Sequence, residues 1–124
     1  MALQGALPTM FVSDMDRAVA FYTEVLGLRL AFRAGDHWAS IDAGAGTQIG
    51  LHPASPGASP RAPGPDAMSV GLNVTEPIET VIAALSARGV EFGDVTSDGM
   101  LKIAHFADPD GNALYLCEQP KWGG

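Results

Sequence analysis

Apolar and polar residues alternate in several short runs of the chain, and this alternation is typical of strands with one buried face. Within residues 68–74 every second residue is apolar, and the residues between them are small or polar. The apolar members of this run and of two others are Met10, Val12, Ile49, Leu51, Met68, Val70, Leu72 and Val74. The alternate members are Leu7, Thr9, Phe11, Gln48, Gly50, His52, Ser69, Gly71 and Asn73. If helices cover only the apolar side of the sheet, the second set faces a small-molecule cavity.

Two segments have the apolar spacing of helices that pack on a sheet. Their apolar stripes are Met15, Val19, Tyr22, Val25 and Leu26 in the first helix, and Ile78, Val81, Ile82 and Leu85 in the second. Ser13 with Asp16 resembles a capping box at the start of the first helix. Thr75 is expected to cap the second helix, with Pro77 in its first turn.

The chain contains an internal repeat, because residues 9–30 and 71–92 align at a constant offset of 62. Three strand-like runs follow each helix, at 28–34, 37–43 and 47–52 and again at 91–96, 100–107 and 112–118. The prediction is one α+β domain, residues 1–124, built from two βαβββ modules at 6–52 and 67–118. A Pro-rich loop at 53–66, which holds five of the nine prolines, joins the modules.

Composition and charge narrow the classes of function. The formal net charge is −7 and only seven Lys and Arg residues are present, which argues against nucleic-acid binding. An acidic surface would attract cationic small molecules, although solubility is the simpler explanation of the charge. Cys117 is the single cysteine, so no disulfide forms within the chain. No signal peptide and no apolar run of about 20 residues is evident, so we expect a cytoplasmic protein without membrane contact.

Two histidines are the candidates for reactivity. By alternation His52 and His105 fall on the cavity side of their strands, where an imidazole could act as general acid or base. The simpler alternative is that each is a polar wall residue that orients a ligand. A third interpretation is that both bind a metal ion in a displaced site.

The last strand-like run follows a turn at Pro109-Asp110-Gly111-Asn112. Alternation places Tyr115 and Cys117 on its cavity side. Tyr115 would offer a ligand a ring and a hydroxyl group, whereas Cys117 is expected to be a small apolar filler. Trp38 either covers the mouth of the cavity or packs in the core.

Two stretches, FVSDMDRAVAFYTEVLGLRL (11–30) and HFADPDGNALYL (105–116), resemble the vicinal oxygen chelate superfamily. This superfamily includes glyoxalase I, bleomycin-resistance proteins, extradiol dioxygenases and fosfomycin-resistance enzymes. The resemblance implies that the two modules form an open mixed-sheet barrel around a cavity, the glyoxalase/bleomycin resistance fold. It also implies a homodimer, in some members with modules exchanged between chains.

The resemblance also implies where a metal would bind. In metal-dependent members the ligand positions correspond to Leu7, Gly50, Ser69 and Tyr115 of this chain. Leu and Gly offer no side-chain donor, and Ser and Tyr bind divalent metals weakly unless they are deprotonated. We therefore expect no divalent metal cofactor.

The expected function is metal-independent binding of a small aromatic or cationic compound, which would sequester a drug or metabolite as bleomycin-resistance proteins do. The ligand-binding candidates are Leu7, Thr9, Phe11, Trp38, Gln48, Gly50, Ser69, Asn73 and Cys117. The alternative is a glyoxalase-like lyase or isomerase, or a related enzyme with a displaced metal. Its catalytic candidates are His52, His105 and Tyr115.

Overall fold

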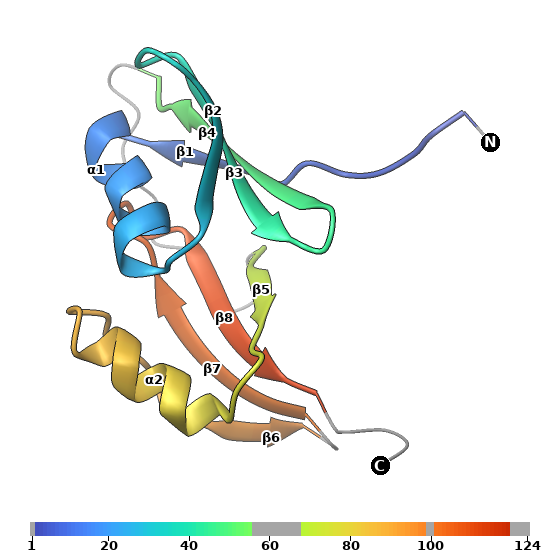
Figure 1. The fold of residues 1–124 in the computed structure, drawn as a ribbon, viewed down its shortest axis with the longest axis vertical. Helices are drawn as coiled ribbons and strands as arrows, with labels where there is room; N and C mark the ends of the chain where they lie inside the picture. Colours follow the sequence, from blue (N-terminus) through green and yellow to red (C-terminus); the bar gives the residue numbers. More distant parts are fainter. Residues whose placement is uncertain (1, 56–67, 99–100, 120–124) are drawn as a thin grey trace. The chain divides into compact units, whose positions relative to one another are not determined.

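The computed structural model describes residues 2–55, 68–98 and 101–119 of the chain (Figure 1). The chain divides into two compact units, residues 1–61 and 62–124. Each unit contains one sheet and is described by itself. Of the predicted Pro-rich loop, residues 56–66 lie outside the described residues.

The first unit has the predicted order of one strand, a helix and three further strands. Its elements are β1 (Thr9–Val12), α1 (Met15–Ala20), the π-helix η1 (Phe21–Val25), β2 (Arg29–Ala34), β3 (Trp38–Gly44) and β4 (Thr47–Pro53). The strands lie in the order β1-β4-β3-β2, with β1 parallel to β4 and the other neighbours antiparallel. Because α1 packs against β3 and β4, a helix covers one face of this sheet (Figure 1).

The second unit repeats this plan. Its elements are β5 (Val70–Asn73), α2 (Ile78–Ser86), β6 (Thr96–Asp98), β7 (Leu101–Ala107) and β8 (Ala113–Glu118). The strand order is β5-β8-β7-β6, again with one parallel pair, β5 and β8, and α2 packs against β8. The predicted α+β class and both βαβββ modules are confirmed, and neither four-stranded sheet closes on itself into a barrel.

The strand predicted at 91–96 is wrong in extent, because β6 begins only at Thr96. Before Thr96 the chain makes separate contacts with β7 and forms no strand ladder. Phe92 packs on Phe106 of β7 with ring centroids 5.1 Å apart, and the Gly93 N–H donates to the His105 carbonyl at 3.0 Å. Phe92 of this segment is thus packed on β7, but the segment does not pair with β7 as a strand.

The cap predicted for the first helix is also wrong. Asp14, rather than Ser13, is the N-cap, and its carboxylate accepts the Arg17 N–H at 3.0 Å. The Ser13 hydroxyl oxygen instead accepts a hydrogen bond from the Arg17 guanidinium at 2.9 Å. Both residues have the chemistry of a cap, and the helix starts one residue later than the sequence pattern predicts.

The second helix is capped from another strand instead of by Thr75. Pro77 occupies the N-cap and α2 begins at Ile78. The Ile78 N–H donates to the Glu118 carboxylate of β8 at 2.8 Å. A proline has no side-chain acceptor, so the unpaired N–H groups of the first helical turn need an outside partner. A carboxylate at this end is also favourable for the helix dipole.

The predicted alternation of faces is confirmed in β1 and β4. Met10 and Val12 are buried, and Ile49 and Leu51 are completely inaccessible to solvent. Met68 is the exception, since it is 81% exposed and was expected to face the helix. It precedes the first residue of β5, so no strand geometry turns it inward.

The apolar stripe of the first helix is buried only in its first half. Met15, Val19 and Tyr22 are buried, whereas Val25 and Leu26 are half-buried. The helix widens from α1 into the π-helix η1, where the Leu26 N–H donates to the Phe21 carbonyl at 3.0 Å. A wider turn has more residues, so positions spaced for an α-helix no longer remain on one face.

Candidate functional site

Most candidate residues of the first unit lie on one face of its sheet. On the side of α1, Ala39, Ile41, Ile49 and Leu51 are fully buried. We call the other side the open face, and it includes Thr9, Phe11, Phe32, Trp38, Ser40, Asp42, Gln48, Gly50 and His52. These residues come from all four strands, so the sheet pairing alone brings them together.

The Trp38 indole is held in one place on the open face. It lies across Gly50 of the neighbouring strand β4, where an added Cβ would overlap Cη2 of the indole and lie 2.9 Å from Cζ2. The Trp38 Nε1–H donates to the Ser40 hydroxyl oxygen at 2.8 Å. Trp38 is half-buried, so the ring is fixed by its surroundings while part of it remains accessible.

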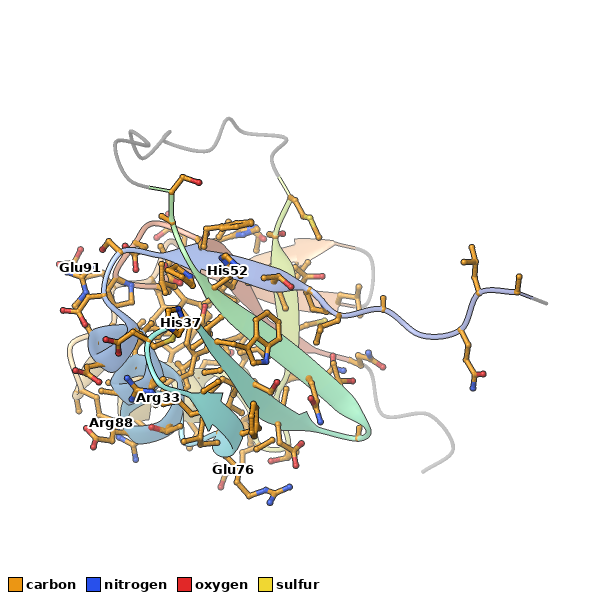
Figure 2. The ribbon with its side chains drawn as sticks, turned by 90° about the horizontal axis from the view of Figure 1, so that it is seen from above. Arg33, His37, His52, Glu76, Arg88 and Glu91 are labelled. Carbon is orange, nitrogen blue, oxygen red and sulfur yellow. The ribbon has the colours of Figure 1, made fainter. Side chains whose placement is uncertain are left out.

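Three aromatic rings form a row across the open face. His52 of β4, which is labelled in Figure 2, lies between Phe11 of β1 and Trp38 of β3. Its ring centroid is 5.6 Å from that of Phe11 and 6.5 Å from that of Trp38, and both contacts are edge-on. Phe11 is 59% exposed. The row therefore presents apolar ring surface to solvent on both sides of an imidazole.

The His52 ring is oriented by the backbone of the next residue. Its Nδ1 lies 2.8 Å from the Pro53 carbonyl oxygen. His52 as a whole is exposed. His37, the other histidine of this unit, is exposed in the turn between β2 and β3 (Figure 2).

Phe32 belongs to the open face although strict alternation does not find it. Leu30 pairs with the buried Ile41, but the register shifts and Phe32 pairs with Ser40. This bulge turns Phe32, which is 59% exposed, to the side of Trp38. The next residue, Arg33, pairs with Asp16 of α1 and therefore lies on the helix side (Figure 2), which agrees with the placement of Phe32 on the opposite side.

The second unit repeats the placement of an aromatic ring on a glycine. Tyr115 of β8 lies across Gly71 of β5, where an added Cβ would be 2.5 Å from the tyrosine hydroxyl oxygen. His105 is the cross-strand partner of Tyr115, with ring centroids 5.7 Å apart. Asn73 accepts a hydrogen bond from Gln119 at 3.2 Å. Cys117 is buried.

The structure thus divides the predicted site residues between two sheets. Thr9, Phe11, Trp38, Gln48, Gly50 and His52 share the open face of the first sheet. Asn73, His105, Tyr115 and Cys117 lie on β5, β7 and β8 of the second. Leu7 and Ser69 precede the first strand of their units, so no strand fixes the direction of either side chain.

The carboxylate on the open face is paired with a cation. Arg29 donates a hydrogen bond to Asp42, and the Gly44 N–H donates to the same carboxylate at 2.8 Å. Both interactions hold the pKa of Asp42 below its ordinary value, and the hydrogen bond from Arg29 is the larger cause. The negative charge next to Gln48 is therefore compensated locally, and rings dominate the rest of the open face.

The positions implied for a metal do not fit a divalent ion. Leu7 and Gly50 have no donor atom, and the Trp38 ring covers Gly50. The Tyr115 ring is directed across Gly71. Within residues 2–55, 68–98 and 101–119, no three His, Cys, Asp or Glu side chains are grouped so that they could hold a metal ion.

Comparison with known proteins identifies the family. The model of the Glyoxalase/Bleomycin resistance protein/Dioxygenase superfamily matches residues 6–116. The chain therefore belongs to this superfamily, and its two mixed sheets are those of the glyoxalase/bleomycin resistance fold. The expectation drawn from the two sequence stretches is confirmed at the level of the family.

Three solved structures illustrate the similarity. TnmS3, an antibiotic binding protein from Streptomyces sp. CB03234, is 28% identical with a TM-score of 0.77, and the match covers 97% of this chain and 99% of that chain. A glyoxalase/bleomycin resistance protein from the same source is 30% identical with a TM-score of 0.70, covering 91% and 98%. A bleomycin resistance determinant encoded on the transposon Tn5 is 22% identical with a TM-score of 0.74, covering 96% and 100%.

No helix in the part of the chain that the structure describes has the length and apolar character needed to cross a membrane.

Proposed function

We propose that this protein binds a flat aromatic small molecule on the open face of its first sheet, without a divalent metal and without changing the ligand chemically. The observation that carries the proposal is the Trp38 indole, which lies across Gly50 and is held by Ser40. Phe11 and Phe32, each 59% exposed, extend the apolar surface around it. Sequestration of a drug or metabolite would follow from such binding alone.

A fixed ring is a favourable binding surface for a physical reason. Ordering a free side chain on binding costs about 0.5–1.5 kcal/mol. The contacts of Trp38 with Gly50 and Ser40 restrict the indole before any ligand arrives, so most of this cost does not arise on binding. Aromatic pairs contribute about 0.5–1.5 kcal/mol beyond the area that they bury. A planar ligand would benefit from both effects.

Two further observations support the class of ligand. TnmS3, which is 28% identical to this chain, is an antibiotic binding protein. The net charge of −7 favours the approach of a cationic molecule over that of an anionic one. We therefore propose a flat aromatic antibiotic or metabolite, neutral or cationic, as the ligand. We also propose that the protein forms the homodimer that the resemblance implies.

Proflavine, a planar aromatic cation, is a suitable probe because its affinity can be measured by titration calorimetry. The wild-type protein is expected to bind it saturably, and Trp38→Leu should weaken binding about tenfold or more, equivalent to about 1.4 kcal/mol. Phe21→Leu is the matched control, since Phe21 lies in the helix η1 and not in a strand of the open face, and it should leave the affinity unchanged. Equal affinities of the wild type and Trp38→Leu would contradict the proposal.

A further inference from the structure

We propose that His52 makes the open face selective for ligands that carry an N–H or O–H donor on the edge of the flat ring system. His52 would accept this hydrogen bond through Nε2. The inference rests on the proposed function and deepens it, because it assigns the chemical feature by which one flat molecule is preferred to another.

The contact with Pro53 fixes the role of each ring nitrogen. The Pro53 carbonyl oxygen, 2.8 Å from Nδ1, can only accept a hydrogen bond. Nδ1 must therefore carry a proton, and the neutral imidazole then has its lone pair on Nε2. In the neutral ring, Nε2 of His52 is thus an acceptor rather than a donor.

Two hydroxyl groups near the centre of the open face already have partners within the protein. The Ser40 hydroxyl oxygen accepts from Trp38 at 2.8 Å, and the Thr9 hydroxyl donates to the Leu7 carbonyl at 3.2 Å. Among the described residues no hydrogen-bond partner of His52 Nε2 is found. Within the aromatic row the Trp38 Nε1–H is a donor, so Nε2 of His52 is the ring nitrogen of the row that can accept a hydrogen bond.

The position of His52 makes this acceptor selective. Its ring stands between Phe11 and Trp38, with centroids 5.6 and 6.5 Å away. A flat molecule that covers these rings would also remove water from Nε2. If the ligand offers no donor, Nε2 loses its hydrogen bond to water without a replacement, which weakens binding. A ligand that places an N–H or O–H there avoids this loss, whereas a methylated analogue does not.

Acridone and N-methylacridone test the inference, because they differ only in that a methyl group replaces the hydrogen on the ring nitrogen. Fluorescence polarisation should show that the wild type binds acridone about tenfold more tightly. His52→Phe keeps an aromatic ring but removes the acceptor, and it should abolish the difference between the two ligands. His37→Phe, in the exposed turn between β2 and β3, is the matched control and should preserve the difference.

The outcomes separate this inference from the proposed function. Equal binding of both acridones to the wild type, with weaker binding of both to Trp38→Leu, would overturn the inference and leave the proposed function intact. Failure of both acridones to bind would overturn the two together. Nitrogen-15 NMR of His52 gives a test without any ligand. A neutral ring protonated at Nδ1 supports the inference, and one protonated at Nε2 overturns it.

Discussion

Replacing Gly50 by alanine is expected to weaken proflavine binding about thirtyfold, equivalent to about 2 kcal/mol. The new methyl group would overlap the Trp38 ring and lie 3.0 Å from the Thr9 hydroxyl oxygen. The indole must then leave its place across β4 and lose its hydrogen bond to Ser40. Crowding of this kind also costs about 1–3 kcal/mol of folding stability. Calorimetric titration and urea unfolding measure the two effects.

Gly93→Ala is the matched control for this substitution. An added Cβ at Gly93 meets nothing within 4 Å, and the backbone there is not left-handed. The change should therefore alter neither binding nor stability by more than about 0.5 kcal/mol. If Gly50→Ala retained wild-type affinity, Trp38 would not be the fixed surface that the ligand requires.

Replacing Ile49 by alanine should have the largest effect on stability. Ile49 has no solvent-accessible surface and lies on the α1 side of β4. Removing a fully buried aliphatic side chain typically lowers the free energy of unfolding by about 2–5 kcal/mol, because it leaves a cavity. Urea unfolding followed by circular dichroism gives the value for this variant.

The neighbouring residue provides the comparison. Gln48 precedes Ile49 in β4 but is exposed on the open face. Gln48→Ala should therefore change the free energy of unfolding by no more than about 0.5 kcal/mol. If Gln48→Ala were as destabilising as Ile49→Ala, the assignment of the two faces of β4 would be wrong.

Strand faces could be predicted from the sequence wherever the ladder is regular. In β4 the alternation of buried Leu51 with exposed His52 follows directly from the period of a strand. The prediction failed for Met68, which is exposed because β5 starts only after it. Alternation also gives no guide to Phe32, because a bulge before this residue turns its side chain to the open face.

Helix ends were less predictable because their partners can be distant in sequence. Thr75 has suitable chemistry for a cap, yet Glu118 accepts the first N–H of α2 from forty residues away. No local pattern contains that information. At the other helix the error was only one residue, since Asp14 and Ser13 are both good capping residues.

The candidate site was predictable as a set of positions but not as an arrangement. Alternation placed Gly50 and His52 on one face, and the resemblance singled out Gly50 as a position without a metal donor. What occupies that position depends on a tertiary contact, because the Trp38 side chain reaches it from the adjacent strand. The function of the glycine, to make room for an aromatic ring, is therefore visible only in the folded chain.

The central claim is that a flat ligand lies on the ring of Trp38. Its most direct test is isotope-filtered NOE spectroscopy of the labelled protein with unlabelled proflavine. We predict intermolecular NOEs from the proflavine ring protons to the ring protons of Trp38 and Phe11. Saturable binding with NOEs confined to residues outside the open face would contradict the claim.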